Sequence, residues 1–201
     1  MSVDIAEIGG IVGPAETCLM TSPLTHRLAR REDVATLRPL MAAAIRALLP
    51  QFLPPEAVEA SFEVMGLDTQ LIEDDTYFVV LCDRVIAGCG GWSRRATLFG
   101  GDHTLGRDDS LLDPQLDAAR VRAMYTRPDF ARRGVGRRVL ELCEQAAAAE
   151  GFRRAQLVAT LAGEPLYRAC GYQERERFEA ATSRGVAVAL VRMDKAIGPP
   201  S

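Results

Sequence analysis

Residues 129–139 read DFARRGVGRRV and gather four arginines around two glycines. The stretch follows a predicted strand that Pro128 ends, and it leads into a helical pattern over residues 135–150. Glycines at such a junction let the backbone turn tightly and let a ligand approach the first helical amides. Those amides have no partner within the helix, and together with the helix dipole they bind phosphate well. The stretch therefore predicts an anion site at the start of a helix.

The arginines around this turn supply charge that can pair with phosphate oxygens; they are Arg132, Arg133, Arg137 and Arg138. Two common phosphate motifs are absent from it. The dinucleotide fingerprint GxGxxG fails because its third position is Val139, and no Gly-Lys-Ser/Thr follows as a P-loop requires. The alternative is an ordinary helix N-terminus with solvated arginines.

The pattern on either side of this turn alternates between strand and helix periodicity. Asp33 is expected to cap the first helix, and Asp83-Arg84 to form a hairpin turn. We expect strands at 24–29, 77–82, 85–92, 120–126, 155–160, 172–178 and 186–193, and helices at 34–48, from Pro55, at 135–150 and at 164–169. Residues 94–118 show no clear period and form a long loop. This order predicts an α/β fold with a mixed sheet.

The composition is that of a globular protein of 201 residues, 48% hydrophobic, with a net charge of −3. We expect an N-terminal tail over residues 1–20 and a single domain over 21–198. The acidic balance argues against a nucleic-acid binder. Five cysteines without CxxC spacing indicate neither a disulfide framework nor a metal site, so reduced thiols and a cytoplasmic location are expected. No signal peptide and no membrane span are indicated.

Two motifs 33 residues apart (167 − 134) extend the argument: the combination VRAMYTRPDFARRGVGRRVLELCE … LVATLAGEPLYRACGYQE resembles the GNAT superfamily of acetyl-CoA-dependent N-acetyltransferases. The resemblance covers roughly residues 24–195. It implies a mixed, mostly antiparallel sheet that is splayed between the cofactor strand and the next strand and flanked by helices. One position departs from the family pattern, because the Arg or Gln three residues before the first glycine is Ala131 here.

The resemblance also implies a site and a reaction, in which an acetyl group moves from acetyl-CoA to an amine of a small molecule or a protein. Backbone groups of Met124, Tyr125 and Thr126 would pair with the pantetheine arm as an added strand pairs with a sheet edge. Tyr167, in LYRACGY, would protonate the leaving thiolate. The amides that would cradle the pyrophosphate belong to Arg132, Arg133, Gly134, Val135, Gly136 and Arg137.

The acceptor half of the site is less clear from sequence. A Tyr hydroxyl with a pKa of about 10 is protonated at neutral pH, whereas a Lys-like amine with a pKa of about 10.4 is mostly charged. A base is not identified, and a proton path through water is equally admissible. Trp92 and His103 are candidate acceptor contacts, with core packing and an exposed loop histidine as their alternatives. His26 is interpreted as structural.

Rival functions remain open at this point. A non-catalytic acyl-CoA-binding domain would use the same fold as a sensor or partner, although a pure binder would not need the Tyr167 hydroxyl. A nucleic-acid-binding module would use the arginine cluster, against which the net charge argues. The acceptor amine is unknown, and because dimerisation is common in the family a homodimer is left open.

Overall fold

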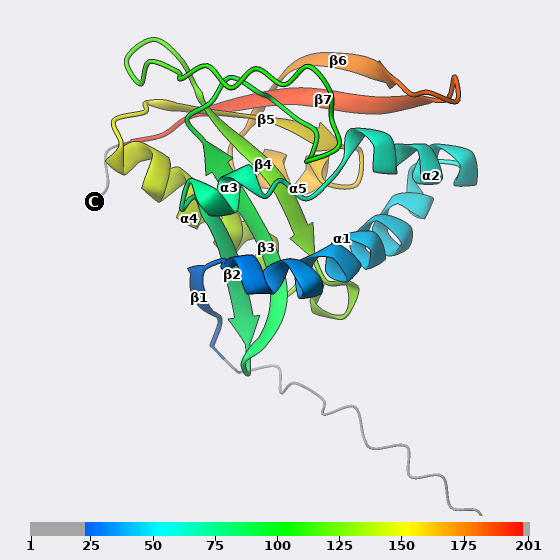
Figure 1. Ribbon diagram of the computed structural model, residues 1–201, viewed down its shortest axis with the longest axis horizontal. Helices are drawn as coiled ribbons and strands as arrows, with labels where there is room; N and C mark the ends of the chain where they lie inside the picture. Colours follow the sequence, from blue (N-terminus) through cyan, green and yellow to red (C-terminus); the bar gives the residue numbers. More distant parts are fainter. Residues whose placement is uncertain (1–22, 199–201) are drawn as a thin grey trace, which may run out of the picture.

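The computed structural model describes residues 23–198, in which a seven-stranded sheet carries helices on both faces (Figure 1). The predicted tail at residues 1–20 lies outside the described residues. Within residues 23–198, no helix is both long and apolar enough to span a bilayer.

The elements agree closely with those expected from the sequence, except for a four-residue helix at Gln70–Glu73 that was not predicted. The strands are β1 (Thr25–Leu28), β2 (Tyr77–Cys82), β3 (Val85–Ser93), β4 (Ala119–Thr126), β5 (Arg154–Thr160), β6 (Gln173–Ala181) and β7 (Ala187–Ala196). The helices are α1 (Val34–Leu48), α2 (Pro55–Val64), α3 (Gln70–Glu73), α4 (Val135–Ala149) and α5 (Glu164–Ala169). Short 3-10 turns precede α1, follow it, and follow β4 at Pro128–Phe130.

The strand order is β1-β2-β3-β4-β5-β7-β6, and every neighbouring pair is antiparallel except β4 and β5. The prediction of a mixed, mostly antiparallel sheet is therefore confirmed. Asp83 and Arg84, with φ of +48° and +66°, form the two-residue turn between β2 and β3. Positive φ at both central residues is what a tight hairpin turn of this kind requires.

Helix α4 lies directly against the middle of β3, and two glycines make this approach possible. A Cβ atom at Gly88 would lie 2.5 Å from Cγ1 of Val135, and one at Gly90 would lie 2.7 Å from Cγ1 of Val139. Any side chain at these positions would push the helix away from the sheet. The glycines of β3 thus permit the close approach of α4.

The sheet separates two apolar cores. Alternation along β2 sends Val80 and Cys82 into the core beneath α4, whereas Tyr77 and Val79 pack with α1 on the opposite face. Leu37, Leu40 and Ile45 form the buried stripe of α1, and the corresponding residues of α4 are Val139, Leu140, Leu142 and Cys143.

The start of α1 differs from the prediction. The Asp33 side chain makes no cap hydrogen bond to α1. Its carboxylate instead accepts two bonds from the Arg27 guanidinium, at 2.7 and 2.8 Å, and one from the Arg30 amide at 2.7 Å. An arginine six residues upstream captures the carboxylate because charge-assisted bidentate pairs are stronger than a neutral cap.

Candidate active site

A fork in the sheet opens between β4 and β5. Only three residue pairs join these strands, from Ala119↔Ala155 to Val121↔Leu157. Beyond these pairs, residues 122–126 of β4 do not pair with residues 158–160 of β5. Strand β5 nevertheless stays paired with β7 along its whole length. The splayed sheet that the family resemblance implies is therefore present, and the fork lies beside the strand expected to hold the cofactor.

A β-bulge in β4 lies at the apex of this fork. Register against β3 jumps between Cys89↔Tyr125 and Gly91↔Arg122, and Ala123 takes a left-handed φ of +50°. The Tyr77 hydroxyl donates a 2.8 Å hydrogen bond to the Ala123 carbonyl. In a trans peptide the N–H points opposite to the carbonyl, so the amide of Met124 points away from Tyr77.

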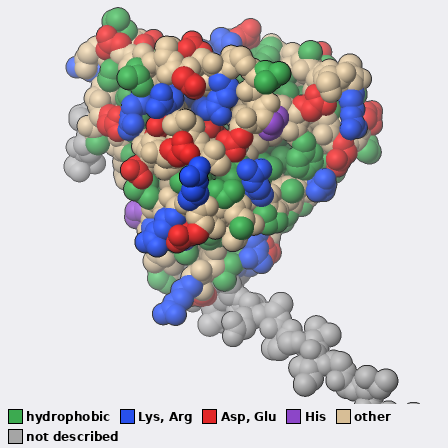
Figure 2. All heavy atoms as spheres, in the orientation of Figure 1, with side chains coloured by type: hydrophobic (Ala, Val, Ile, Leu, Met, Phe, Trp, Pro, Cys, Tyr) green, Lys and Arg blue, Asp and Glu red, His purple; other side chains and the backbone are tan. Residues whose placement is uncertain are grey.

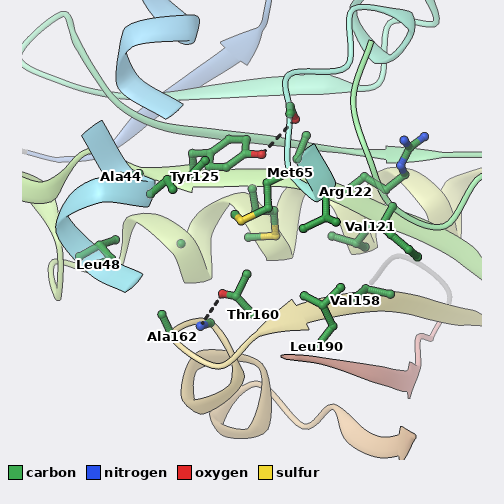
Figure 3. A pocket seen from close by; sticks show the side chains of 18 of the residues that line it. Ala44, Leu48, Met65, Val121, Arg122, Tyr125, Val158, Thr160, Ala162 and Leu190 are labelled. Atoms are coloured by element: carbon green, nitrogen blue, oxygen red, sulfur yellow. Dashed lines mark hydrogen bonds between the residues drawn. The ribbon is translucent and has the colours of Figure 1, made fainter. Parts of the chain in front are cut away.

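A pocket of about 210 Å³ occupies the fork, small enough to take the reacting ends of two molecules rather than a whole drug-sized ligand (Figure 3). In the close-up, Ala44, Leu48, Tyr125 and Met65 lie on one side and Thr160, Ala162, Val158 and Leu190 on the other. The described residues that line it are Ala44, Ile45, Leu48, Leu49, Val64, Met65, Gly66, Cys89, Leu98, Phe99, Gly100, residues 121–126, Gly136, Val158, Thr160, Ala162, Gly163, Leu166, Tyr167 and Leu190.

The turn between β4 and α4 presents unused donors. Gly134 has φ +81° and Arg132 has φ +65°, which is the left-handed backbone that the tight turn requires. Among residues 23–198, the amides of residues 132–137 make no well-aligned hydrogen bond; the first amide that makes one is that of Arg138, which donates to Gly134. These amides are exposed or lie at the helix end, and so they are free for an anionic ligand.

Three guanidinium groups at this turn also lack carboxylate partners within the described chain. Arg132, Arg133 and Arg137 are exposed and form no ion pair there, whereas Arg138 pairs with Glu141 at 3.4 Å. The Arg133 guanidinium lies over the ring of Phe130, 5.4 Å from its centroid. Amides and arginines together make a cradle suited to the phosphates of a nucleotide.

Gly136 connects the cradle with the pocket, since it lines the pocket at the first turn of α4. A Cβ atom there would lie 2.8 Å from Cδ2 of Leu166 in α5 and 3.5 Å from Oγ1 of Thr126 at the end of β4. The glycine therefore lets β4, α4 and α5 pack closely at the point where the cradle meets the pocket.

Tyr167 points its hydroxyl into the fork. The side chain is 9% exposed, and the hydroxyl lies 3.7 Å from Sδ of Met124. Burial raises the pKa of the Tyr167 hydroxyl above its ordinary value, so the group is protonated at neutral pH. Tyr125, the other tyrosine of the pocket, donates its hydroxyl to the Gly66 carbonyl at 3.0 Å and so holds the pocket wall.

The two candidate acceptor contacts do not line the pocket. Trp92 is 1% exposed and packs edge-to-face on Phe152, with ring centroids 5.9 Å apart, in the core beneath α4. It shares the α4 side of β3 with Gly88 and Gly90, because side chains alternate along a strand. Trp92 is therefore a core residue and is not retained as an acceptor contact.

The histidines are also accounted for. His103 is exposed, and its Nε2 lies 3.0 Å from the Glu63 carbonyl, which joins the long loop to the end of α2. His26 lies in β1, exposed, opposite Val80 of β2. Neither histidine lines the pocket. Within residues 23–198, no three His, Cys, Asp or Glu side chains come together as a metal site requires.

A buried ion cluster, which the sequence analysis did not identify, holds the long loop against the pocket. Asp68 is fully buried and accepts bonds from Arg107 at 3.0 Å and from Arg122 at 2.8 Å. Arg122 also donates to the Gly100 carbonyl at 3.3 Å. An arginine inside the apolar strand RVRAMYT was the available signal, since a buried guanidinium requires a carboxylate.

Comparison with solved structures supports the fold. A GCN5-related N-acetyltransferase from Rhodopseudomonas palustris is 18% identical, covering 88% of this chain and 97% of its own, with a TM-score of 0.63. PaiA N-acetyltransferase from Thermoplasma acidophilum, solved in complex with coenzyme A, is 12% identical over 87% and 99% of the two chains, with a TM-score of 0.58. The protein yncA of Salmonella typhimurium, solved with acetyl-CoA, is 15% identical over 86% and 93% of the two chains, with a TM-score of 0.57.

The family comparison agrees with the geometry of the fork. A search of curated proteins found no match. The model of the acetyltransferase (GNAT) domain, however, matches residues 73–174, about half of the chain, from the end of α3 to the start of β6. This region contains the bulge, the cradle and Tyr167. The chain belongs to the GNAT family and is a GNAT-type N-acetyltransferase.

Proposed function

We propose that the protein binds acetyl-CoA along β4 and transfers its acetyl group directly to an amine in the fork. The observation that carries this proposal is the cradle at residues 132–137, whose free amides and unpaired arginines lie next to the pocket at Gly136. A pyrophosphate suits the cradle, and an extended arm suits the unpaired side of β4 at Met124, Tyr125 and Thr126.

Acetyl-CoA supplies a thioester carbonyl that an uncharged amine can attack. The nitrogen–carbon bond forms, the carbon–sulfur bond breaks, the amine loses a proton to water, and the sulfur takes a proton. The Met124 amide, which points away from Tyr77, is assigned as the donor to the negative charge that develops on the carbonyl oxygen. A fixed donor of this kind contributes roughly 3–4 kcal/mol to other acyl transfers.

Tyr167 is assigned as the group that meets the leaving sulfur. Its hydroxyl has only the Met124 sulfur as a partner among the described residues, so the hydrogen is free to turn toward another sulfur in the pocket. Burial keeps the phenol protonated, and the same burial makes the phenolate unfavourable. The donated proton must therefore be replaced from solvent within the same catalytic cycle.

A titration of the purified protein tests the assignment. We expect acetyl-CoA to bind with micromolar affinity, S-acetylpantetheine to bind far more weakly because it lacks the phosphates, and NAD to show no binding. Release of the coenzyme A thiol in the presence of an amine would then report the transfer. Equal affinity for acetyl-CoA and S-acetylpantetheine would show that the cradle does not bind the phosphates. An absence of acetyl-CoA binding would contradict the proposed function.

The nucleic-acid alternative finds no support on the face that Figure 2 shows. Lys and Arg side chains there are interspersed with Asp and Glu, and neither sign forms a continuous patch. A surface that binds a phosphate backbone presents a basic stripe or patch instead. The unpaired arginines gather at one helix end, which suits a single small anionic ligand.

A further inference from the structure

The part of the pocket that the donor arm leaves free has apolar walls. The arm would enter at Thr126, beside the cradle, so the remaining space lies toward α1, the end of α2 and the long loop. Ala44 and Leu48 face this space from α1 and Met65 faces it from the segment after α2 (Figure 3). The other apolar walls are Leu98, Phe99, Val158 and Leu190.

The walls contain no counter-ion for a cation. Among the described residues that line the pocket there is no Asp, Glu, His or Lys, and the only charged one is Arg122. The Arg122 side chain is 2% exposed and is bonded to Asp68, whose carboxylate is shared with Arg107. An ammonium group that entered the pocket would lose its water and find a guanidinium instead of a carboxylate, at a cost of several kcal/mol.

The lining also offers no group that could remove a proton from an ammonium at neutral pH. Apart from Arg122, the ionisable side chains that face the pocket are Cys89 on β3, Tyr125 on β4 and Tyr167 on α5. Burial raises the pKa of the Cys89 thiol to about 12, and it raises the pKa values of both tyrosines. All three groups keep their protons, so the amine has to lose its proton in solution before it binds.

We infer that the acceptor is a weakly basic amine on an apolar body, such as an α-amino group beside a large apolar side chain, rather than a lysine ε-amine or a polyamine. The inference rests on the proposed function and names the substrate class of the same pocket. At pH 7.5 roughly a third of an α-amino group with a pKa near 7.8 is uncharged, against about one part in a thousand of a lysine amine with a pKa near 10.4. The ratio favours the weakly basic amine by about 300-fold.

The test compares four amines in an assay of thiol release from acetyl-CoA. Phenylalaninamide has both required properties, glycinamide lacks the apolar body, and Nα-acetyl-lysinamide and spermidine carry strongly basic amines. We expect kcat/KM for phenylalaninamide to exceed that for glycinamide by at least tenfold and that for the two basic amines by at least about 100-fold. The kcat/KM for phenylalaninamide should rise with pH and level off near the pKa of its amine.

Two kinds of outcome would overturn the inference and leave the proposed function in place. One is transfer to spermidine or Nα-acetyl-lysinamide with an equal or higher kcat/KM. The other is transfer to none of the four amines by a protein that binds acetyl-CoA, since phenylalaninamide meets both conditions. A failure to bind acetyl-CoA in the titration described above is a separate result, because it removes the proposed function itself.

A matched pair of variants tests the role of the walls. Leu48→Glu places a carboxylate on the pocket wall, where it supplies both a counter-ion and a proton acceptor. We expect it to narrow the preference for phenylalaninamide over Nα-acetyl-lysinamide by at least tenfold. Leu28→Glu makes the same change at a half-exposed leucine of β1 that does not line the pocket, and it should leave the preference unchanged. Equal preferences in the two variants would contradict the assignment of the walls.

Discussion

The hydroxyl of Tyr77 lies 2.8 Å from the carbonyl oxygen of Ala123, the residue at the centre of the β4 bulge. Tyr77 is fully buried in the core beneath α1, and the bond reaches from β2 across β3 to β4. A non-glycine residue in the left-handed region costs on the order of 1–2 kcal/mol and persists only where its surroundings hold it. The hydroxyl therefore stabilises the backbone turn that orients the Met124 amide.

Tyr77→Phe should separate catalysis from donor binding. We expect kcat to fall by about tenfold, because the oxyanion donor loses its fixed direction, while the affinity for acetyl-CoA stays the same. Stability should fall by about 1–3 kcal/mol, because the Ala123 carbonyl is left without a donor. Thr76→Val is the control, since it removes another buried hydroxyl bond, to the Leu71 carbonyl at 3.2 Å, away from the bulge. Equal kcat values in the two variants would contradict the role of Tyr77.

Gly136→Arg should abolish acetyl-CoA binding, because its side chain would displace Leu166 and block the place where the cradle meets the pocket. The neighbouring Leu166 atom is the end of a flexible side chain, so the fold should survive, as circular dichroism can check. Gly198→Arg introduces the same side chain where nothing lies within 4 Å of the glycine. Calorimetry should show loss of binding in the first variant alone. Undiminished affinity of Gly136→Arg would contradict the placement of the donor at this turn.

Removing the charge of the cradle should weaken the binding of acetyl-CoA, and only through the contacts to its phosphates. Replacing Arg132, Arg133 and Arg137 with Gln should lower the affinity for acetyl-CoA by about 100-fold or more, if each phosphate contact contributes roughly 1 kcal/mol or more. Affinity for S-acetylpantetheine, which has no phosphate, should not change. Arg153→Gln, at an exposed arginine just before β5, serves as the control. A parallel loss for both ligands would point to a structural effect instead.

Tyr167→Phe should lower kcat by about 100-fold with little change in the affinity for acetyl-CoA, because the leaving sulfur loses its proton donor. Tyr172→Phe is a close control. Its ring packs edge-to-face on that of Tyr167, with centroids 6.0 Å apart, but it does not line the pocket. A single-turnover assay isolates the chemical step from product release. An unchanged rate in Tyr167→Phe would assign the proton to another source.

The pair Arg95–Asp74, which fixes the start of the long loop, should make stability depend on pH. The Arg95 guanidinium bonds at 2.7 and 2.9 Å hold the pKa of Asp74 below its usual value. A carboxyl with a lowered folded-state pKa stabilises the fold above its unfolded value of about 3.9, and that contribution is lost as pH falls through the folded pKa. Asp74→Asn should thus cost about 1–3 kcal/mol at pH 7.

Urea unfolding at pH 7, 5 and 3 measures this dependence. The stability difference between wild type and Asp74→Asn should be full at pH 7 and should shrink below about pH 4, where the wild-type carboxyl also loses its charge. Asp75→Asn is the neighbouring control: Asp75 is exposed, and its φ of +56° suits asparagine. A difference that stays constant across the pH range would exclude the pair as its origin.

Local sequence signals predicted the elements because each signal acts through its own neighbours. The turn at Asp83 and Arg84, Pro50 just after α1, and Gly134 before α4 fix conformation within a few residues. Boundaries of the predicted strands and helices consequently agree with the structure to within a few residues. The same local chemistry is the basis for proposing an anion site at residues 132–137.

Contacts between distant segments were not predictable in this way. Asp68 and Arg107 are 39 residues apart and meet only because the long loop folds back over the end of α2. The place of Trp92 was available in principle, since Gly88, Gly90 and Trp92 alternate onto one side of β3. The pattern alone does not show that α4 covers that side of β3, so it could not distinguish a pocket wall from the core.

Because so few residue pairs join β4 and β5, binding of acetyl-CoA along β4 should also stabilise the fold. With only three residue pairs joining these strands, the open edge of β4 must satisfy its backbone through water until a ligand takes that place. Amide hydrogen exchange at residues 124–126 should therefore slow when acetyl-CoA binds, whichever amine is the acceptor. At a concentration of 100 times Kd, binding adds about 2.7 kcal/mol to the unfolding free energy, so a rise in melting temperature reports donor occupancy before any substrate is known.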